Sequence, residues 1–337
     1  MKFTDDDLLL VTGATGLVGS HVVERAHQLG VRTRVLARSS SDTSLLEQWG
    51  AEITSGDMSD ADSLRAAVKD VTAIVHCAAK VGDWGPVDDY RAVNVEGLET
   101  LLSSALATGQ LKRMIHISSL GVYEARDHHG TDETESPSSG GIDGYTRTKF
   151  EAEQLVLKHV RENRLPATVL RPGFIYGPRD RTILPRLLEK IKTKTFAFLG
   201  SGEQLMNNTY VGNLVDGIFL AIENDAAVGE VFNITDGQLV SKREFMTKVA
   251  ELAGYEAPTR NVPLGVAKFL AKVMEGTWRW LGKAEAPLLS NARIKFLGLN
   301  LDFCIDKAKR ELGYRPGVAF PEGMERTIDW FRSQKMV

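Results

Sequence analysis

Cysteine is scarce in this sequence: Cys77 and Cys304 are the only two among 337 residues. Two cysteines are too few for a disulfide framework or a cysteine-rich zinc site, and their scarcity suits a reducing compartment. No stretch approaches the roughly 18 uncharged apolar residues that span a bilayer. The start of the chain, MKFTDDDLLLVTG, is acidic and lacks a signal-peptide pattern. We therefore expect a cytoplasmic protein.

The sequence also lacks an excess of charge of either sign. Its 41 basic and 44 acidic residues give a formal net charge of -3, which offers no general attraction to nucleic acid or to an anionic membrane. Metal-ligand spacing is missing too, since no matching ligands follow the adjacent His128 and His129. We expect a small-molecule substrate, no metal and no nucleic acid. Residues 126–144, which are polar and rich in glycine, are assigned to a mobile loop.

The first half of the chain alternates short apolar runs with helical patterns such as residues 17–29. The runs are rich in β-branched residues, which is typical of buried parallel strands. They cover residues 8–12, 34–37, 73–77, 114–118 and 167–170. This alternation predicts an α/β protein with a Rossmann-type, doubly wound parallel sheet.

The rhythm changes after Gly177 and Pro178, where longer helical segments are separated by isolated strands. Residues 1–178 are therefore predicted to form a dinucleotide-binding domain. Residues 179–337 are predicted to form a smaller, mixed α/β substrate-binding domain, with some exchange of segments between the two.

A glycine-rich turn follows the first predicted strand and opens the first helix. Gly13 can make the tight turn, Gly16 lets the backbone approach a pyrophosphate, and Gly19 lets helix and strand pack closely. The start of the helix presents free N–H groups to the phosphates. A tight turn that binds no ligand is the alternative interpretation. The glycine-rich turn stands at the start of a strand–helix series, which favours a cofactor-binding turn, or cradle. The cradle residues are Gly13, Thr15, Gly16, Leu17, Val18 and Gly19.

The end of the second predicted strand bears on the choice of cofactor. An acid there would hold the ribose 2′-hydroxyl of NAD(H), but the sequence has Arg38 and Ser39 instead. A guanidinium matches the geometry of a 2′-phosphate, so NADP(H) is the favoured cofactor and NAD(H) the alternative. The competing interpretation of Arg38 is a solvated arginine on the surface. Asp57, in the motif GDMSD, is a candidate to hydrogen-bond the adenine amino group, with Met58 beside it.

A phenol and an ammonium group lie four residues apart, at Tyr145 and Lys149, on one face of a predicted helix. A free tyrosine has a pKa of about 10, and a nearby cation and a helix start both favour the phenolate. Ser118 and Ser119 lie at the end of the predicted strand at residues 114–118, where ligands of such sheets bind. A hydroxyl there can donate to a substrate oxygen while Tyr145 exchanges its proton and a nicotinamide carries hydride.

The order of these motifs resembles the extended branch of the short-chain dehydrogenase/reductase superfamily, the NAD-dependent epimerase/dehydratase family. The motifs TGATGLVGSH, GDMSD, HCAA, ISSLGVY, YTRTK and LRPGFIYGP carry the resemblance along the whole chain. It implies a catalytic triad of Ser119, Tyr145 and Lys149, and a homodimer that pairs helices at residues 94–107 and 145–160. The further positions that line the cofactor are His76, Ala78, Ala79, Asn94, Ser118, Pro172, Gly173, Phe174 and Ile175.

Within that branch the sequence resembles the 3β-hydroxysteroid dehydrogenase group more than the sugar-nucleotide epimerases. The segment from Val81 to Gly85 contains Trp84, and the second half holds a long apolar helix. Leu120 and Gly121 follow Ser119 in place of the acid pair of a dehydratase, which disfavours a dehydratase. The candidates for substrate contact are Val81, Trp84, Ser119, Tyr123 and Tyr145, with plain packing as the alternative for Trp84. We expect interconversion of a secondary alcohol and a ketone on a steroid-like or 3-oxo/3-hydroxy acyl substrate. An NDP-sugar epimerase with tightly bound NAD and a non-catalytic nucleotide-sensing regulator are the alternatives.

The apolar helix at residues 264–281 has two interpretations. Apolar residues recur at helical spacing, and Lys268, Lys272, Glu275 and Arg279 share the opposite side. A lid or core helix of the second domain is favoured. A helix on a membrane surface is the alternative, but Glu275 counts against it, so no membrane association is expected.

Overall fold

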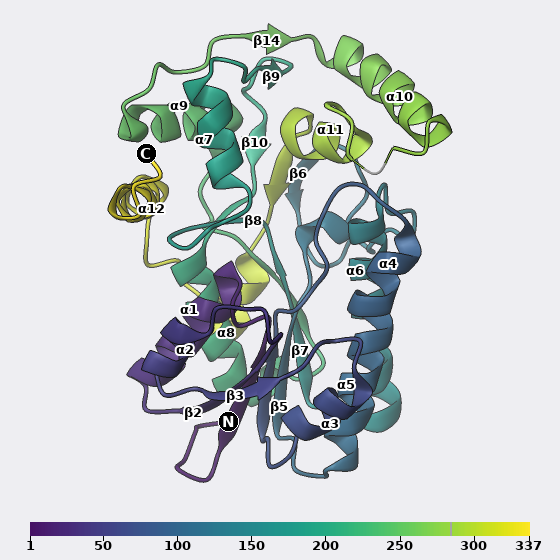
Figure 1. The fold of residues 1–337 in the computed structure, drawn as a ribbon, viewed down its shortest axis with the longest axis vertical. Helices are drawn as coiled ribbons and strands as arrows, with labels where there is room; N and C mark the ends of the chain where they lie inside the picture. The colour runs from purple at the N-terminus through teal and green to yellow at the C-terminus, as the bar shows by residue number, and fades with distance from the viewer. Residues whose placement is uncertain (284) are drawn as a thin grey trace.

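A seven-stranded parallel sheet forms the centre of the molecule in a computed structural model that describes residues 1–283 and 285–337. The strand order is β12-β7-β5-β4-β1-β2-β3 (Figure 1), which confirms the predicted Rossmann-type sheet. The strands are β1 (Leu8–Thr12), β2 (Arg32–Ala37), β3 (Glu52–Ser55), β4 (Ala73–His76), β5 (Arg113–Ile117), β7 (Ala167–Pro172) and β12 (Val231–Ile234).

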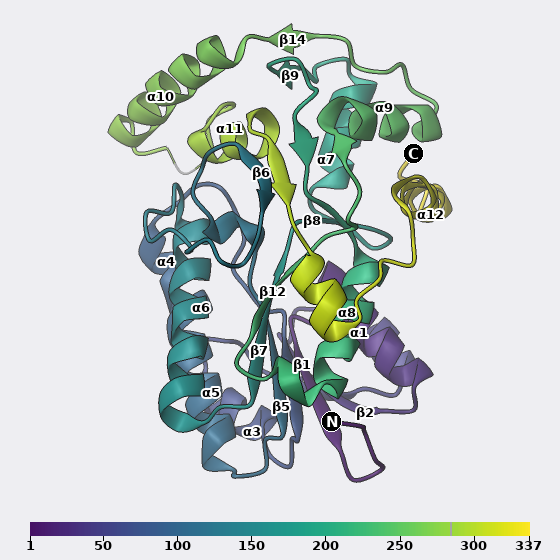
Figure 2. The ribbon, with the colours of Figure 1, turned by 180° about the vertical axis from the view of Figure 1, so that it is seen from behind.

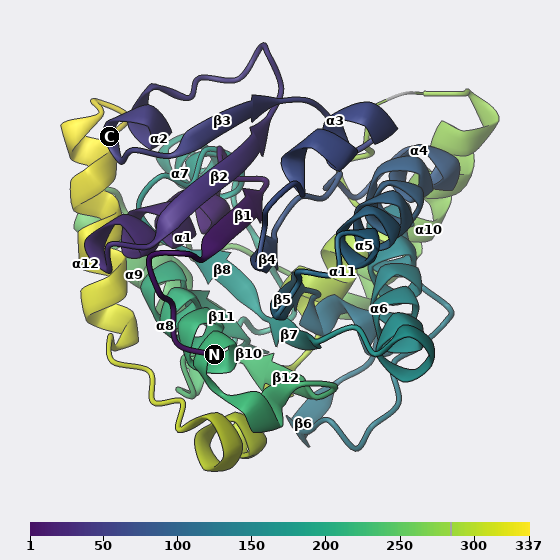
Figure 3. The ribbon, with the colours of Figure 1, turned by 90° about the horizontal axis from the view of Figure 1, so that it is seen from below.

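Helices cover both faces of this sheet, as the view from below shows (Figure 3). Successive residues of β1 point to opposite faces: Leu9 and Val11 pack in one core, Leu8 and Leu10 in the other. The first core is closed by α1 (Leu17–Gln28), α2 (Ser44–Gln48) and α8 (Val211–Glu223). The other face carries α3 (Ala61–Ala67), α4 (Val87–Arg91), a π-helical turn (Ala92–Glu96), α5 (Gly97–Ala107) and α6 (Gly144–Asn163).

The second half builds a mixed layer above the sheet (Figures 1 and 2). Its helices are α7 (Leu184–Lys192), α9 (Lys242–Ala253), α10 (Leu264–Trp280), α11 (Asn291–Gly298) and α12 (Phe320–Ser333). Short strand pairs link them: β8 (Phe174–Tyr176) with β11 (Asn208–Tyr210), β9 (Phe198–Leu199) with β14 (Asn261–Val262), and β10 (Leu205–Met206) with β13 (Val240–Ser241). The domain boundary at residue 178 stays a prediction. Strand β12 comes from beyond that residue yet pairs with β7 in the central sheet.

The prediction of a mobile loop over residues 126–144 is wrong in its first part. Residues His128–Thr131 form β6, which pairs with β15 (Leu301–Phe303). His128 is fully buried, its ring lies 4.5 Å from that of Phe303, and its Nε2 is 2.9 Å from the carbonyl oxygen of Glu124. The strand partner lies about 170 residues away in the sequence, so no local pattern marks it.

Of the favoured interpretation of residues 264–281 as a lid or core helix, the core helix does not hold, and the lid stays a prediction. Ala267 and Ala271 are the residues of α10 that are buried, where it meets α11. Within the described parts of the chain, no helix is long and apolar enough to cross a membrane. The same residues contain no group of three or more His, Cys, Asp or Glu side chains that could hold a metal ion.

Candidate active site

The glycine-rich turn lies between β1 and β4, where the chain changes direction across the sheet and where ligands of such folds bind. Gly13 has φ 68°, and a Cβ there would come within 2.7 Å of the backbone nitrogen of Ala78. A Cβ at Gly19 would collide with the backbone of Gly13 and Ala14. The two glycines are therefore required for the turn to approach β4 and for α1 to pack against it.

The start of α1 is open to an anionic ligand. Gly16 is its N-cap and provides no side chain to hold the first N–H groups. Thr15 and Gly16 are exposed, and Leu17 and Val18 are half-buried. The bare helix start and the two constrained glycines fit a dinucleotide pyrophosphate.

The predicted adenosine contacts lie together at the ends of β2 and β3. Arg38 and Ser39 are exposed, and the Arg38 charge is close enough to Asp57 to act on its carboxyl group. Hydrogen bonds from Ser59 lower the pKa of Asp57, and Arg38 lowers it further. Both Ser59 bonds fall on Oδ1. The Met58 side chain is buried in the core, so it can offer only its backbone to a ligand.

His76 does not face the cradle. Its ring is buried, and Nδ1 lies 2.8 Å from Oγ1 of Thr12, which accepts a 3.3 Å hydrogen bond from the backbone N–H of Ala78. Burial lowers the pKa of His76 to about 3, so the imidazole stays neutral. His76 thus positions the turn at Ala78 and the half-buried Ala79 through Thr12.

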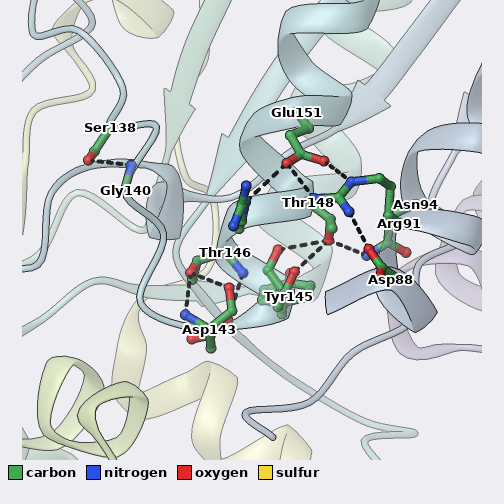
Figure 4. Close-up of polar contacts among 12 residues, drawn as sticks. Asp88, Arg91, Asn94, Ser138, Gly140, Asp143, Tyr145, Thr146, Thr148 and Glu151 are labelled. Carbon is green, nitrogen blue, oxygen red and sulfur yellow. Dashed lines mark hydrogen bonds and ion pairs between the residues drawn. The ribbon is translucent and has the colours of Figure 1, made fainter. Parts of the chain in front are cut away.

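Asn94 fixes the same turn from the other side. It lies buried in the π-helical turn, a distortion that is frequent at functional sites. Its Oδ1 accepts from the backbone of Lys80 at 2.7 Å, and its Nδ2 donates to the carbonyl of Lys80 and to Thr148 Oγ1 (Figure 4). Asn94 therefore connects the segment after β4 to α6.

The structure brings Ser119, Tyr145 and Lys149 to one place. Ser119 follows β5, and its Oγ accepts a 3.0 Å bond from the N–H of Gly121. Tyr145 stands at the start of α6, whose N-cap Asp143 accepts from the N–H of Thr146 at 2.7 Å in a capping box (Figure 4). Lys149 lies one turn further along the helix and is buried, and its Nζ donates to the carbonyl of Ile117 at 2.7 Å.

The electrostatics of Tyr145 differ from the sequence expectation of a favoured phenolate. Burial raises the pKa of Tyr145 to about 12, and the carboxylate of Asp143 raises it as well, while a side-chain hydrogen bond with Ser119 lowers it. Lys149 shows the opposite change, because burial lowers its pKa to about 8. The site therefore combines a protonated phenol with a buried amine whose pKa is about 8.

A buried network behind the site accounts for two predicted residues that do not face it. Ser118 Oγ donates to Glu153 Oε2 at 2.7 Å, and Glu153 forms a buried ion pair with Arg171. Arg171 donates to Tyr123 Oη at 2.7 Å, and Tyr123 donates in turn to Asn233 at 3.1 Å. The predicted cofactor contact of the Ser118 side chain and substrate contact of Tyr123 do not fit this arrangement, since both are buried with other partners.

The segment after β7 closes the site beside β11. Gly173 donates its N–H to Thr209 Oγ1 at 3.1 Å, and any Cβ there would strike the backbone of Asn207. Pro172 is buried, Phe174 packs its ring 4.9 Å from that of Phe296, and Ile175 is half-buried. The backbone and Ile175, rather than the ring of Phe174, are available to a ligand.

The segment after β4 contacts the upper layer. Val81 is 65% exposed, and Trp84 Nε1 donates to the carbonyl of Lys283 at 3.0 Å. Arg293 of α11 forms a 2.7 Å ion pair with Asp83. From the same helix, Lys295 donates to the carbonyls of Gly121 and Tyr123, beside Ser119. Sequence reasoning missed Lys295, because nothing near it in the chain marks its partners.

The sheet, the cradle at its switch point and the tyrosine–lysine helix define a nicotinamide-dinucleotide-dependent enzyme of the extended short-chain dehydrogenase/reductase type. Residues 9–235 match the NAD dependent epimerase/dehydratase family, and the chain belongs to this family.

Similar proteins span nearly the whole chain. A 4-hydroxy-2-methyl-3-oxo-4-farnesyl-3,4-dihydroquinoline-1-oxide ketoreductase of Stigmatella aurantiaca is 32% identical, covering 94% of each chain. A 2-alkyl-3-oxoalkanoate reductase of Stenotrophomonas maltophilia is 29% identical, covering 94% of this chain and 97% of the other. The crystal structure of gox2253 superimposes with a TM-score of 0.83 at 32% identity, covering 98% of this chain and 99% of that one.

Proposed function

We propose that this chain is an NADP(H)-dependent ketoreductase that converts a ketone on a largely apolar substrate into a secondary alcohol. The observation that carries the proposal is the half-buried phenol of Tyr145, which is hydrogen-bonded to Ser119 and has a pKa of about 12. A phenol with that pKa keeps its proton at neutral pH. It is therefore ready to give that proton to an oxyanion, as ketone reduction requires.

When bound, the reduced nicotinamide supplies the hydride that adds to the carbonyl carbon. As the electron pair of the C=O π bond moves to oxygen, the Tyr145 hydroxyl transfers its proton to that oxygen. The Ser119 hydroxyl donates a hydrogen bond to the same atom. The Lys149 ammonium, one helical turn from Tyr145, stabilises the phenolate that remains. The products are the alcohol and the oxidised cofactor.

The two named reductases support an apolar 3-oxo substrate. One is named for a compound with a 3-oxo group and a farnesyl chain, the other for a 2-alkyl-3-oxoalkanoate. Each buried CH₂ of such a substrate contributes about 0.8 kcal/mol to binding. A long alkyl or isoprenoid group therefore outweighs one or two polar contacts, and a 3-oxo acyl compound is the first choice over a steroid.

The cofactor preference is proposed on Arg38, which lies exposed at the end of β2 beside Asp57. A charge-assisted hydrogen bond to a 2′-phosphate contributes about 1.5–3 kcal/mol, so NADPH should bind roughly ten- to a hundredfold more tightly than NADH. Arg38→Ala should remove this preference, and Arg32→Ala, at the start of the same strand, should keep it. Fluorescence titration with both cofactors measures the two affinities. Equal affinities in the wild type would refute the assignment.

Product analysis separates reduction from epimerisation. We expect one NADPH to be oxidised for each 3-oxo ester or acid consumed, followed by absorbance, with the hydroxy product identified by mass spectrometry. A sugar-nucleotide epimerase would instead invert a UDP-sugar while its bound NAD is retained unchanged over many turnovers. Inversion of a UDP-sugar without net oxidation of cofactor would overturn the proposal.

A further inference from the structure

Helix α10 and the turn that follows it carry an apolar face that none of the described residues covers. The inner side holds Ala267 and Ala271 against α11. On the outer side Phe269 is 67% and Trp280 is 84% exposed, and this helix forms the upper rim of the molecule (Figure 1). The exposed apolar residues of this face are Val266, Phe269, Leu270, Val273, Trp280 and Leu281.

A basic strip runs along one border of that face. At about 100° per residue, the six apolar residues fall within an arc of roughly 120°, and Lys268, Lys272 and Arg279 fall within an adjacent arc of roughly 40°. All three basic residues are exposed. The helix therefore has three sides: one packed on α11, one apolar and exposed, and one basic.

Glu275, the acid that counts against a membrane role, lies on neither the exposed apolar side nor the basic side of the helix. Glu275 is largely buried, and its carboxylate accepts from the backbone and side chain of Asn291 at 2.6 and 2.9 Å. Arg279 approaches it only at 3.9 Å. Within residues 1–283 and 285–337, neither Lys268 nor Lys272 forms an ion pair with an acid, so the positive charge of these two lysines is uncompensated there.

We propose that α10 docks on a bilayer surface of anionic phospholipid, lying flat with its apolar face in the headgroup region and its basic strip on the lipid phosphates. An amphipathic helix with aromatic and apolar residues beside lysine and arginine is suited to this position. A second copy of the chain is the less complementary occupant, because it would bring the same positive strip toward its partner. The proposal is independent of the reaction at Tyr145.

The docked helix would lie beside the segment that follows β4, which belongs to the candidate active site. The carbonyl of Lys283, at its end, accepts from the indole N–H of Trp84, and Arg279 lies 5.8 Å from the centre of the Trp84 ring. Trp84 belongs to the segment that follows β4, next to the exposed Val81. An apolar compound dissolved in the bilayer would therefore leave the bilayer next to the candidate active site.

Vesicle flotation tests the docking. Wild-type protein should float with vesicles of phosphatidylcholine and phosphatidylglycerol at least about tenfold more than with phosphatidylcholine alone, and added salt should reduce the binding. Phe269→Ser/Val273→Ser/Trp280→Ser and, separately, Lys268→Glu/Lys272→Glu should each lower binding about tenfold. Leu29→Ser/Leu239→Ser removes two exposed leucines elsewhere and should bind as the wild type does.

Circular dichroism and light scattering complete the test. The altered side chains are exposed, so every variant should keep its fold. If the triple variant is unfolded, the binding of Lys268→Glu/Lys272→Glu to vesicles decides the test. No flotation of the wild type, or equal flotation of wild type and both variants, would overturn the proposal. A self-associated wild type that becomes smaller in the triple variant and never binds vesicles would show that a second copy covers the face instead.

Discussion

One hydroxyl distinguishes tyrosine from phenylalanine, and at position 145 that hydroxyl is the proposed proton donor. Tyr145→Phe should lower kcat for ketone reduction by about 100-fold or more, the scale of a general acid. The affinity for NADPH should hardly change. Steady-state absorbance gives kcat and fluorescence titration gives Kd, with Tyr255→Phe as a control in a different part of the molecule. A variant that turns over like the wild type would remove Tyr145 from the mechanism.

The charge of Lys149 predicts how the rate depends on pH. Burial lowers its pKa to about 8, so the ammonium that stabilises the phenolate is present below that value and lost as the pH rises through it. The wild-type kcat should therefore fall above about pH 8. In Lys149→Arg the guanidinium stays charged up to about pH 12, so whatever activity remains should not fall above pH 8. Profiles of kcat between pH 6 and 10 compare the two, and the same fall in the wild type and in Lys149→Arg would contradict this role.

At the scale of single residues, sequence spacing predicted which groups meet but not how each is charged. Tyr145 and Lys149 lie one turn apart, so their proximity follows from the helix. The raised pKa of Tyr145 depends on burial and on Asp143, which no spacing reveals. Tyr123 was misplaced because its partners, Arg171 and Asn233, come from strands far along the chain.

Between elements, the buried pair of Glu153 on α6 and Arg171 on β7 connects the catalytic helix to the sheet. Arg171→Leu should lower the free energy of unfolding by about 3–5 kcal/mol, because it leaves a buried carboxylate without its cation. Glu153→Leu/Arg171→Leu removes both charges and should lose less than the single variant. Urea unfolding followed by circular dichroism measures both. A double variant less stable than Arg171→Leu would show that the pair stabilises the fold beyond cancelling its own charges.

Elements with a regular pattern were predictable, and those defined by distant partners were not. The run at residues 8–12 coincides with β1, and the helical pattern at residues 17–29 with α1, which ends at Gln28. The sequence predicts a loop where strand β6 lies, because the partner of this strand, β15, is distant in the chain. The helical periodicity of α10 is visible in the sequence. Periodicity does not reveal which apolar side of the helix packs on α11 and which is exposed.

For the whole molecule, a homodimer through α5 and α6 stays a prediction. The outer side of α5 exposes the small residues Ser103 and Ala107, which would allow a close approach of two helices. Light scattering should give twice the chain mass of 37.0 kDa. Ser103→Arg/Ala107→Arg places bulky charges at that contact and should yield the single-chain mass. A wild type that is monomeric at every concentration would rule the dimer out.

The place of β12 has a consequence for how the protein is made. Strand β7 pairs with β5 on one side and with β12 on the other, and α8 covers the same core. A nascent chain that has emerged only to residue 178 therefore lacks a strand and a covering helix of its own nucleotide-binding half. The ribosome must add residues up to Ile234 first, which takes roughly 3–11 s at about 5–20 residues per second. During that interval the incomplete sheet edge is a natural point of engagement for a chaperone.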